Sequence, residues 1–294
     1  MPMTHINNIE KFNIKKIDEV AELPTLPNVA NEIMNMIDKP YVSAAKLAKL
    51  ISQDQGMVAK ILSLANSPVY GLTQKVSTIE LAIVVLGFDT IKELIISLSI
   101  LNSAQSRNER YFNTNYFGKH SILCGTVARM LANDFGYRVS GEAFIAGLLH
   151  DIGISTMQKY LTSEFNLISE LRFYQKISQL DAEKIIIGKT HPEIGSHLAS
   201  KWNFPAQLIE SIRFHHSPSE AVLNPTLTAL IHLADHISSL VSEPYLLVEE
   251  SEKLDDSIIE TLELPDETYL QGLIRSTIEL INSNFKELAS MQVN

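Results

Sequence analysis

The sequence has little cysteine, little glycine or proline, and no long apolar run. Its 294 residues contain one cysteine, Cys124, so an intrachain disulfide and a cysteine-rich zinc site are both excluded. The 12 glycines and 11 prolines leave few turns for a many-stranded β fold. The most apolar stretch covers only residues 94–101, whereas a helix needs about 20 residues to span a bilayer.

Positive charge is also scarce. The chain has 24 lysines and arginines against 34 aspartates and glutamates, a formal net charge of −10, so general attraction to nucleic acid or to anionic membranes is not expected. Residues 1–16 lack the apolar core of a signal peptide. We therefore expect a cytoplasmic protein that binds neither nucleic acid nor membrane, and we leave its oligomeric state open.

Hydrophobic residues recur at helical spacing along the whole chain, with no alternating strand pattern between them. The helix that ends at His150-Asp151 is interpreted as stopped by Gly153. We predict an all-α fold of two lobes with a C-terminal helical extension. The predicted helices cover residues 29–37, 44–51, 57–65, 77–86, 90–101, 115–133, 141–151, 162–175, 181–187, 192–202, 206–214, 226–241 and 266–288.

Composition suggests where the chain divides. The polar stretch 105–110 makes a boundary between two lobes, and the acidic stretch 249–256 is interpreted as a linker before the terminal helix. In the first lobe, Asn66 and Ser67 are interpreted as satisfying local backbone groups, without a catalytic role.

Eight of the nine histidines lie between His120 and His236. His120 falls on the apolar face of its helix, and taken alone it favours a core histidine that is hydrogen-bonded to a carbonyl. His150 and Asp151 stand side by side at the end of a buried helix. An imidazole nitrogen and a carboxylate oxygen in that position suit one metal ion, or else a simple hydrogen bond at the helix end.

Other polar residues lie at helix ends or inside apolar helices. His191 precedes Pro192 at a helix start, and His215 and His216 follow a helix end, where both an ordinary cap and a surface position remain open. Asp235 lies within an apolar helix, so a metal ion or a histidine should neutralise its charge. Three further histidines are interpreted as structural or surface residues: His197, His232 and His236.

The order of these residues, in a helical frame, resembles the HD superfamily of metal-dependent phosphohydrolases. The flanking segments AGLLHDIG (146–153), HPEIG (191–195), WNFP (202–205) and HHSP (215–218) are similar to the HDOD family, the HD-related output domains. So are the N-terminal segments at residues 23–27, 51–54, 65–71 and 82–87. The resemblance covers about residues 21–242. It therefore implies one domain there, with an N-terminal lobe at about residues 21–108 and an HD-like lobe at about residues 109–242, preceded by an N-terminal lead at residues 1–20 and followed by an acidic linker with a helix at residues 243–294.

The resemblance implies an all-helical bacterial signal-transduction protein of two lobes, one of them HD-like, with divalent metal ions: iron, manganese, magnesium, nickel or zinc. It implies catalytic roles for His150 and Asp151. In the order of HD-GYP enzymes, the implied metal ligands are His120, His150, Asp151, His191, His215, His216 and Asp235.

The chain also departs from the HD-GYP pattern. Ile154 stands where those enzymes usually carry a lysine, Tyr116 stands where some carry an acidic ligand, and no Gly-Tyr-Pro motif follows His216. The resemblance therefore supports metal binding better than cyclic-di-GMP hydrolysis. Two functions remain: a metal-dependent phosphohydrolase acting on a nucleotide or other phosphoester, and a non-catalytic signalling module that binds a nucleotide or a protein partner. A nucleic-acid-binding protein is disfavoured, because the chain has no basic stripe.

Overall fold

In the computed structural model, helices make up the regular secondary structure of the residues that it describes. Within them, the one β pairing is an isolated antiparallel bridge between Phe112 and Leu246. The predicted all-α fold is confirmed. The described residues are 43–52, 55–66, 75–88, 90–91, 94–95, 111–202, 204–242, 244–246 and 254–291.

Some of the predicted features lie outside the described residues. These are the N-terminal lead, the helix at 29–37, Ser67, the segments at 23–27 and 67–71, and the polar stretch at 105–110.

The described part of the N-terminal lobe includes three short helices: α3 (Ala44–Ile51), α4 (Gln55–Ala65) and α5 (Ile79–Leu86). Ser43 and Thr78 cap α3 and α5, because their hydroxyl oxygens accept backbone N–H groups of the first turn. Asn66 follows α4 and donates to the carbonyl oxygens of Leu62 and Val76, and its own side-chain oxygen accepts the Val76 N–H. This confirms that Asn66 satisfies backbone groups. The same hydrogen bonds join the end of α4 to the segment that leads into α5.

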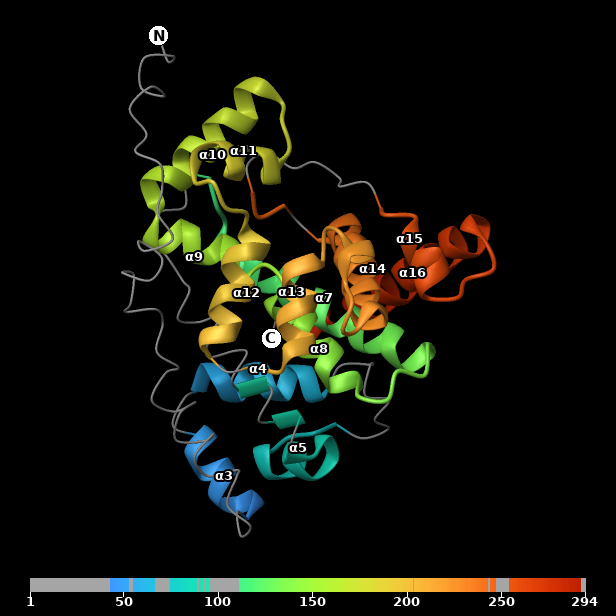
Figure 1. The fold of residues 1–294 in the computed structure, drawn as a ribbon. Coiled ribbons are helices and arrows are strands. Elements are labelled where there is room, and N and C mark those ends of the chain that lie inside the picture. The colour runs from blue at the N-terminus through green and yellow to red at the C-terminus, as the bar shows by residue number, and fades with distance from the viewer. Residues whose placement is uncertain are drawn as a thin grey trace.

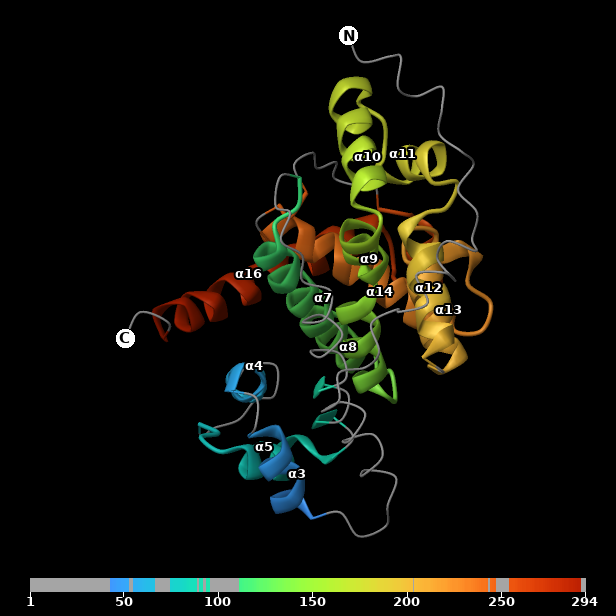
Figure 2. The same cartoon turned by 90° about the vertical axis from the view of Figure 1, so that its left-hand side faces the viewer.

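The rest of the chain forms a larger helical body. In Figures 1 and 2, α3–α5 lie at one end of the molecule and α10–α11 at the opposite end. The predicted helix at 90–101 lies mostly outside the described residues, and every other helix predicted within them is found within three residues of its expected bounds. The helices are α7 (Thr114–Asp134), α8 (Ser140–Leu149), α9 (Ile152–Tyr160), α10 (Thr162–Gln175), α11 (Gln179–Ile186), α12 (His191–Lys201), α13 (Ala206–Phe214), α14 (Pro225–Val241), α15 (Ser257–Thr261) and α16 (Glu267–Met291).

Helix α9 was not predicted, and the interpretation of Gly153 as a helix stop is wrong. Gly153 lies inside α9, directly after the break at His150-Asp151. A Cβ atom on Gly153 would lie 2.0 Å from the carbonyl oxygen of His191, closer than any real contact. Glycine is required here because the backbones of α9 and α12 touch, and this contact brings His191 next to Asp151.

A second close approach joins α7 to α8. A Cβ atom on Gly147 would lie 2.9 Å from the carbonyl oxygen of Cys124, and one on Gly125 would lie 2.7 Å from that of Phe144. Because the two helices cross at glycines, the histidines that they carry come near each other. The rings of His120 and His150 lie 5.4 Å apart between centroids.

The hydrophobic core has two main parts. One runs without a break from the N-terminal lobe into the second lobe, from Ile51 and Ile83 to Phe117 and Ile154. The other joins α7, α8 and α14 with the C-terminal segment, in which Ile258, Leu262, Leu264, Leu270, Ile274 and Ile281 are buried. In the part of the chain that the structure describes, no helix is both long and apolar enough to cross a membrane.

Candidate metal centre

The fold brings together the seven predicted metal ligands, which come from five separate places in the chain. His120 comes from α7, His150 and Asp151 from the α8–α9 junction, and His191 from the first residue of α12. The other three lie at the end of α13 and within α14: His215, His216 and Asp235. All but His216 and Asp235 are buried, and the exposed fraction of these five residues is 3% or less.

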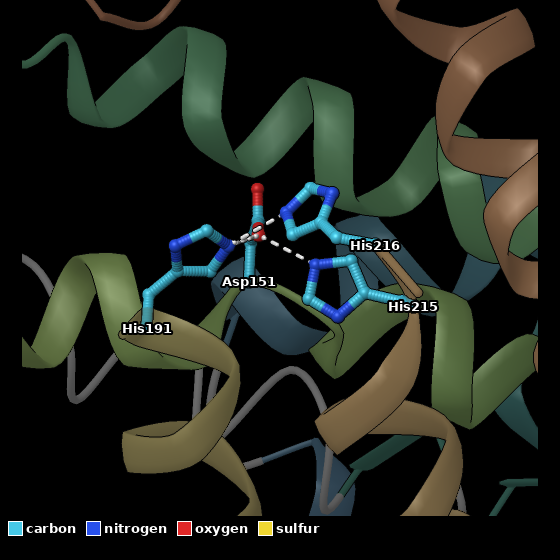
Figure 3. Close-up of side chains that lie close together, drawn as sticks. All are labelled: Asp151, His191, His215 and His216. Atoms are coloured by element: carbon cyan, nitrogen blue, oxygen red, sulfur yellow. Dashed lines mark hydrogen bonds and ion pairs between the residues drawn. The ribbon is translucent and has the colours of Figure 1, made fainter. Parts of the chain in front are cut away.

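Four of these side chains form what we term the Asp151 cluster: Asp151, His191, His215 and His216. Figure 3 shows them pointing toward one another. Oδ1 of Asp151 lies 3.2 Å from Nε2 of His191 and 3.4 Å from Nε2 of His215. Nε2 of His191 lies 2.9 Å from Nε2 of His216.

The other three side chains form the Asp235 cluster: His120, His150 and Asp235. Oδ1 of Asp235 lies 3.1 Å from Nε2 of His120 and 3.3 Å from Nε2 of His150. Oδ2 of Asp151 also lies 3.3 Å from Nε2 of His150. One carboxylate therefore faces both clusters, with Oδ1 toward one and Oδ2 toward the other.

Hydrogen bonds at the outer ring nitrogens fix how the histidines are oriented. Nδ1 of His150 donates to the carbonyl oxygen of Gly147 at 2.7 Å, and Nδ1 of His215 donates to that of Ile212 at 2.7 Å. Nδ1 of His120 lies 3.2 Å from Oγ of Ser242. That hydroxyl gives its proton to the carbonyl of Ser238, so it accepts from His120. In each case Nε2 is the nitrogen that faces the site.

Glu183 holds His191 in the same way, a contact that the sequence analysis did not predict. Both oxygens of Glu183 lie 3.0 Å from Nδ1 of His191, and Oε2 also accepts the backbone N–H of His191 at 2.7 Å. Glu183 lies on α11 and is completely buried. A glutamate on the buried face of a short helix, eight residues before a candidate ligand, is the one signal that could have found it.

Tyr245 is a second residue that the sequence did not indicate. It follows α14, and its hydroxyl donates a short hydrogen bond to Oδ2 of Asp151. His232 also has a defined place: its Nδ1 donates to the carbonyl of His215, and its Nε2 accepts the backbone N–H of Asp255. The structural interpretation of His232 is thereby confirmed. His197 and His236 are half-buried, outside both clusters.

Four buried atoms in the two clusters have ion-pair contacts of 3.1–3.4 Å but no well-aligned hydrogen bond: Nε2 of His120, His150 and His215, and Oδ1 of Asp151. Buried charged groups in proteins are ordinarily paired or coordinate metals. Two ligand atoms that are each about 2.1 Å from one ion lie about 3.0–3.4 Å apart at right or tetrahedral angles. The separations of 2.9–3.4 Å between neighbouring ligand atoms in the clusters are close to that range, so these residues fit divalent metal ions.

The ionisation of the site also suits metal binding. Burial alone would raise the pKa of Asp151 and of Asp235, but the imidazole of His150 outweighs it and holds both pKa values well below their usual range. Burial lowers the pKa of His215 to about 3, with His216 acting in the same direction. Both carboxylates are therefore ionised at pH 7, and His215 is neutral.

His150 and His191 behave differently from His215. Burial would lower the pKa of His150, but nearby carboxylates, Asp151 above all, outweigh burial and raise it well above its usual value. Burial would also lower the pKa of His191, but the carboxylates of Glu183 and Asp151 raise it to about 10. In the metal-free protein this imidazole carries a proton that a metal ion must displace.

Two curated proteins are similar to this chain in sequence. A protein of Treponema pallidum (strain Nichols), described as uncharacterized, is 26% identical over 276 residues, which are 92% of this chain and 51% of that protein. Ribonuclease Y of Mycoplasma mycoides is 28% identical over 183 residues, which are 58% of this chain and 36% of that protein. The chain thus spans about half, or less, of the length of these curated relatives.

Solved structures show the same architecture. An HDOD domain protein of unknown function from Geobacter sulfurreducens superposes with a TM-score of 0.68 at 24% identity, covering 94% of this chain and 96% of that one. A protein from Shewanella amazonensis SB2B, described as a candidate phosphohydrolase, gives 0.68 at 24% identity, covering 90% and 93%. At this identity the likeness establishes the fold.

The family itself is established by sequence. The family model of the HDOD domain matches residues 23–218, about two thirds of the chain, and so includes both the N-terminal lobe and the two histidines that follow α13. This chain belongs to the HDOD family.

Proposed function

We propose that this HDOD protein is a metal-dependent phosphohydrolase that acts on a phosphoester, with a nucleotide as the substrate class. One observation carries the proposal: five imidazoles and two carboxylates from five places in the chain converge in two adjoining clusters, each compact enough to hold one ion. Buried groups of this kind are ordinarily paired or coordinate metals, and here they face one another at ion-pair distance without well-aligned hydrogen bonds.

The two clusters would each hold one ion, and Asp151 would contribute an oxygen to both. Five imidazoles and two carboxylates make a nitrogen-rich donor set, which favours iron, nickel or zinc over magnesium, a metal that prefers oxygen ligands. When bound, such ions lower the pKa of a coordinated water and polarise a phosphoryl oxygen.

Other groups of the chain orient the metal ligands. The carbonyls of Gly147 and Ile212, the hydroxyl of Ser242 and the carboxylate of Glu183 hold four imidazoles with Nε2 toward the site. Asp235 is 16% exposed and His216 is half-buried, whereas the other five ligands are buried. A substrate would therefore approach from the side of Asp235 and His216.

The relatives favour a phosphoester as substrate. Ribonuclease Y is named for cleaving RNA, whose backbone is a phosphodiester. The net charge of −10 disfavours a long polyanion here and favours a small phosphoester.

A turnover assay tests the proposal. The full chain is purified without chelator or histidine tag, loaded with manganese or iron, and assayed with p-nitrophenyl phosphate, bis(p-nitrophenyl) phosphate and cyclic dinucleotides. We expect turnover of at least one substrate that is lost in Asp151→Asn and kept in Asp181→Asn, a change at an exposed aspartate on α11.

One observation favours a second function, a metal-binding signalling module without catalysis. Ile154, at the position where HD-GYP enzymes usually carry a lysine, is 2% exposed and packs in the hydrophobic core. The site thus lacks a cation from this position. Full metal occupancy without turnover of any substrate would select this function, and its ligand would then be a nucleotide or a protein partner.

A further inference from the structure

The hydroxyl of Tyr245 contacts the one carboxylate that faces both clusters. It donates to Oδ2 of Asp151, the oxygen that lies 3.3 Å from Nε2 of His150. A carboxylate oxygen has two acceptor positions, so Oδ2 can accept this hydrogen bond and still bind a metal ion with its other lone pair.

Tyr245 is fixed in place by three neighbours. Its carbonyl oxygen accepts the backbone N–H of Asn113 at 2.8 Å, and the next residue, Leu246, forms the β-bridge with Phe112. Its ring packs against Phe117 with centroids 5.4 Å apart, and it lies 5.0 Å from the ring of His120. The hydroxyl thus reaches Asp151 from a rigid position, which is what orienting a ligand requires.

The same stretch of chain also touches the Asp235 cluster. Ser242, three residues earlier, accepts the Nδ1 proton of His120. Both contacts come from the chain just after α14, beyond residues 23–218 that the family model matches. Neither residue is among the seven ligands, yet together they contact one member of each cluster.

We propose that Tyr245 is a positioning residue that fixes the carboxylate of Asp151 so that its two oxygens face the two metal sites. The proposal rests on the proposed metal centre. Without the hydroxyl, rotation of the carboxylate would turn Oδ2 away from His150, and the ions would lose a shared ligand. Removing a residue that hydrogen-bonds to a metal ligand typically weakens metal affinity by about 10–100-fold.

Tyr245→Phe tests the proposal, because it removes the hydroxyl and keeps the ring. The matched control is Tyr111→Phe, which removes another tyrosine hydroxyl that donates to a carboxylate, Oε1 of Glu170 at 3.0 Å, outside both clusters. Metal-free full chains are titrated calorimetrically with Mn²⁺, and the absorption spectrum of the Co²⁺-loaded protein reports the ligands around the metal.

We expect Tyr245→Phe to raise the Kd for Mn²⁺ about 10–100-fold and to change the Co²⁺ spectrum, while Tyr111→Phe changes neither. A Kd within threefold of wild type, or a tighter one, overturns the proposal. A weaker Kd with an unchanged Co²⁺ spectrum also overturns it, because the metal ligands would then be arranged as before. Wild-type protein that binds no metal would overturn the proposed function, and this inference with it.

Discussion

Nε2 of His120 lies 3.1 Å from Oδ1 of Asp235, although the two residues come from α7 and α14. The close crossing of α7 and α8 at Gly125 and Gly147 brings His150 to the same carboxylate. The Asp235 cluster is therefore built by α7, by α14 and by the end of α8.

Asp235→Asn should remove one of the two ions. The amide keeps the shape of the side chain but loses the charge that balances the metal, so bound metal should fall from two ions per chain to one. Elemental analysis of protein dialysed against Mn²⁺ measures this. Retention of both ions would show that Asp235 is not a ligand.

Metal should also stabilise the fold. A ligand that binds only the folded state at 100 times its Kd adds about 2.7 kcal/mol to the free energy of unfolding. We expect Mn²⁺ to raise the Tm of the wild-type chain and chelator to reverse the change. The rise should be smaller for Asp235→Asn, and an equal rise would contradict a role for this cluster.

Gly153→Ala should destabilise the protein through the contact of α9 with α12. The new methyl group would meet the carbonyl oxygen of His191, and overpacking of this kind costs about 1–3 kcal/mol or more. Gly272→Ala is the control, because nothing lies within 4 Å of its Cβ position in α16. There alanine should add about 0.5–1 kcal/mol to the free energy of unfolding. Urea denaturation distinguishes the two, and equal effects would refute the close approach.

Glu210 should make stability depend on pH. Burial would raise its pKa, but the backbone N–H groups of Leu223, Val222 and Asn224 outweigh burial and hold the pKa below its usual range. A depressed pKa stabilises the fold above the unfolded value of about 4.3, and this contribution is lost as the pH falls through the folded value.

Glu210→Gln should therefore lower the free energy of unfolding by about 1.5–3 kcal/mol at pH 7, the range for hydrogen bonds to a charged group. The difference from wild type should shrink below about pH 4.3. Denaturation curves at a series of pH values measure it, with the exposed Glu220→Gln as the control. A difference that stays constant with pH would mean that the charge plays no part.

Asn66→Ala should weaken the N-terminal lobe without affecting the metal. Three hydrogen bonds to Leu62 and Val76 are lost, at about 0.5–1.5 kcal/mol each. The sequence indicated only local backbone partners for Asn66, whereas in the structure two of these three hydrogen bonds join it to Val76, ten residues away. Calorimetric titration with Mn²⁺ should give an unchanged Kd. A weakened Kd at an unchanged Tm would instead place part of the metal centre in this lobe.

Periodicity was enough to place most of the helices, because their apolar faces are continuous and their ends carry caps such as Ser43 and Thr78. It failed at α9. Glycine commonly ends a helix, and a single sequence does not show that Gly153 is needed for contact with a distant backbone, that of His191.

The seven candidate ligands were predicted from their order along the chain, which reflects a resemblance to a family. Glu183 and Tyr245 were missed because no short motif contains them. Each reaches the site only in the folded structure. Glu183 contacts His191 across the turn between α11 and α12, and a backbone hydrogen bond with Asn113 holds Tyr245 in place. Residues that orient ligands leave a weaker local pattern than the ligands do.

Anomalous X-ray diffraction from crystals of the Mn²⁺-loaded full chain tests the metal centre most directly. We predict two anomalous peaks. One should lie among Asp151, His191, His215 and His216, and the other among His120, His150 and Asp235, with an oxygen of Asp151 near each. Crystals grown with excess Mn²⁺ that show no anomalous peak at either cluster would contradict the metal centre and the function proposed from it.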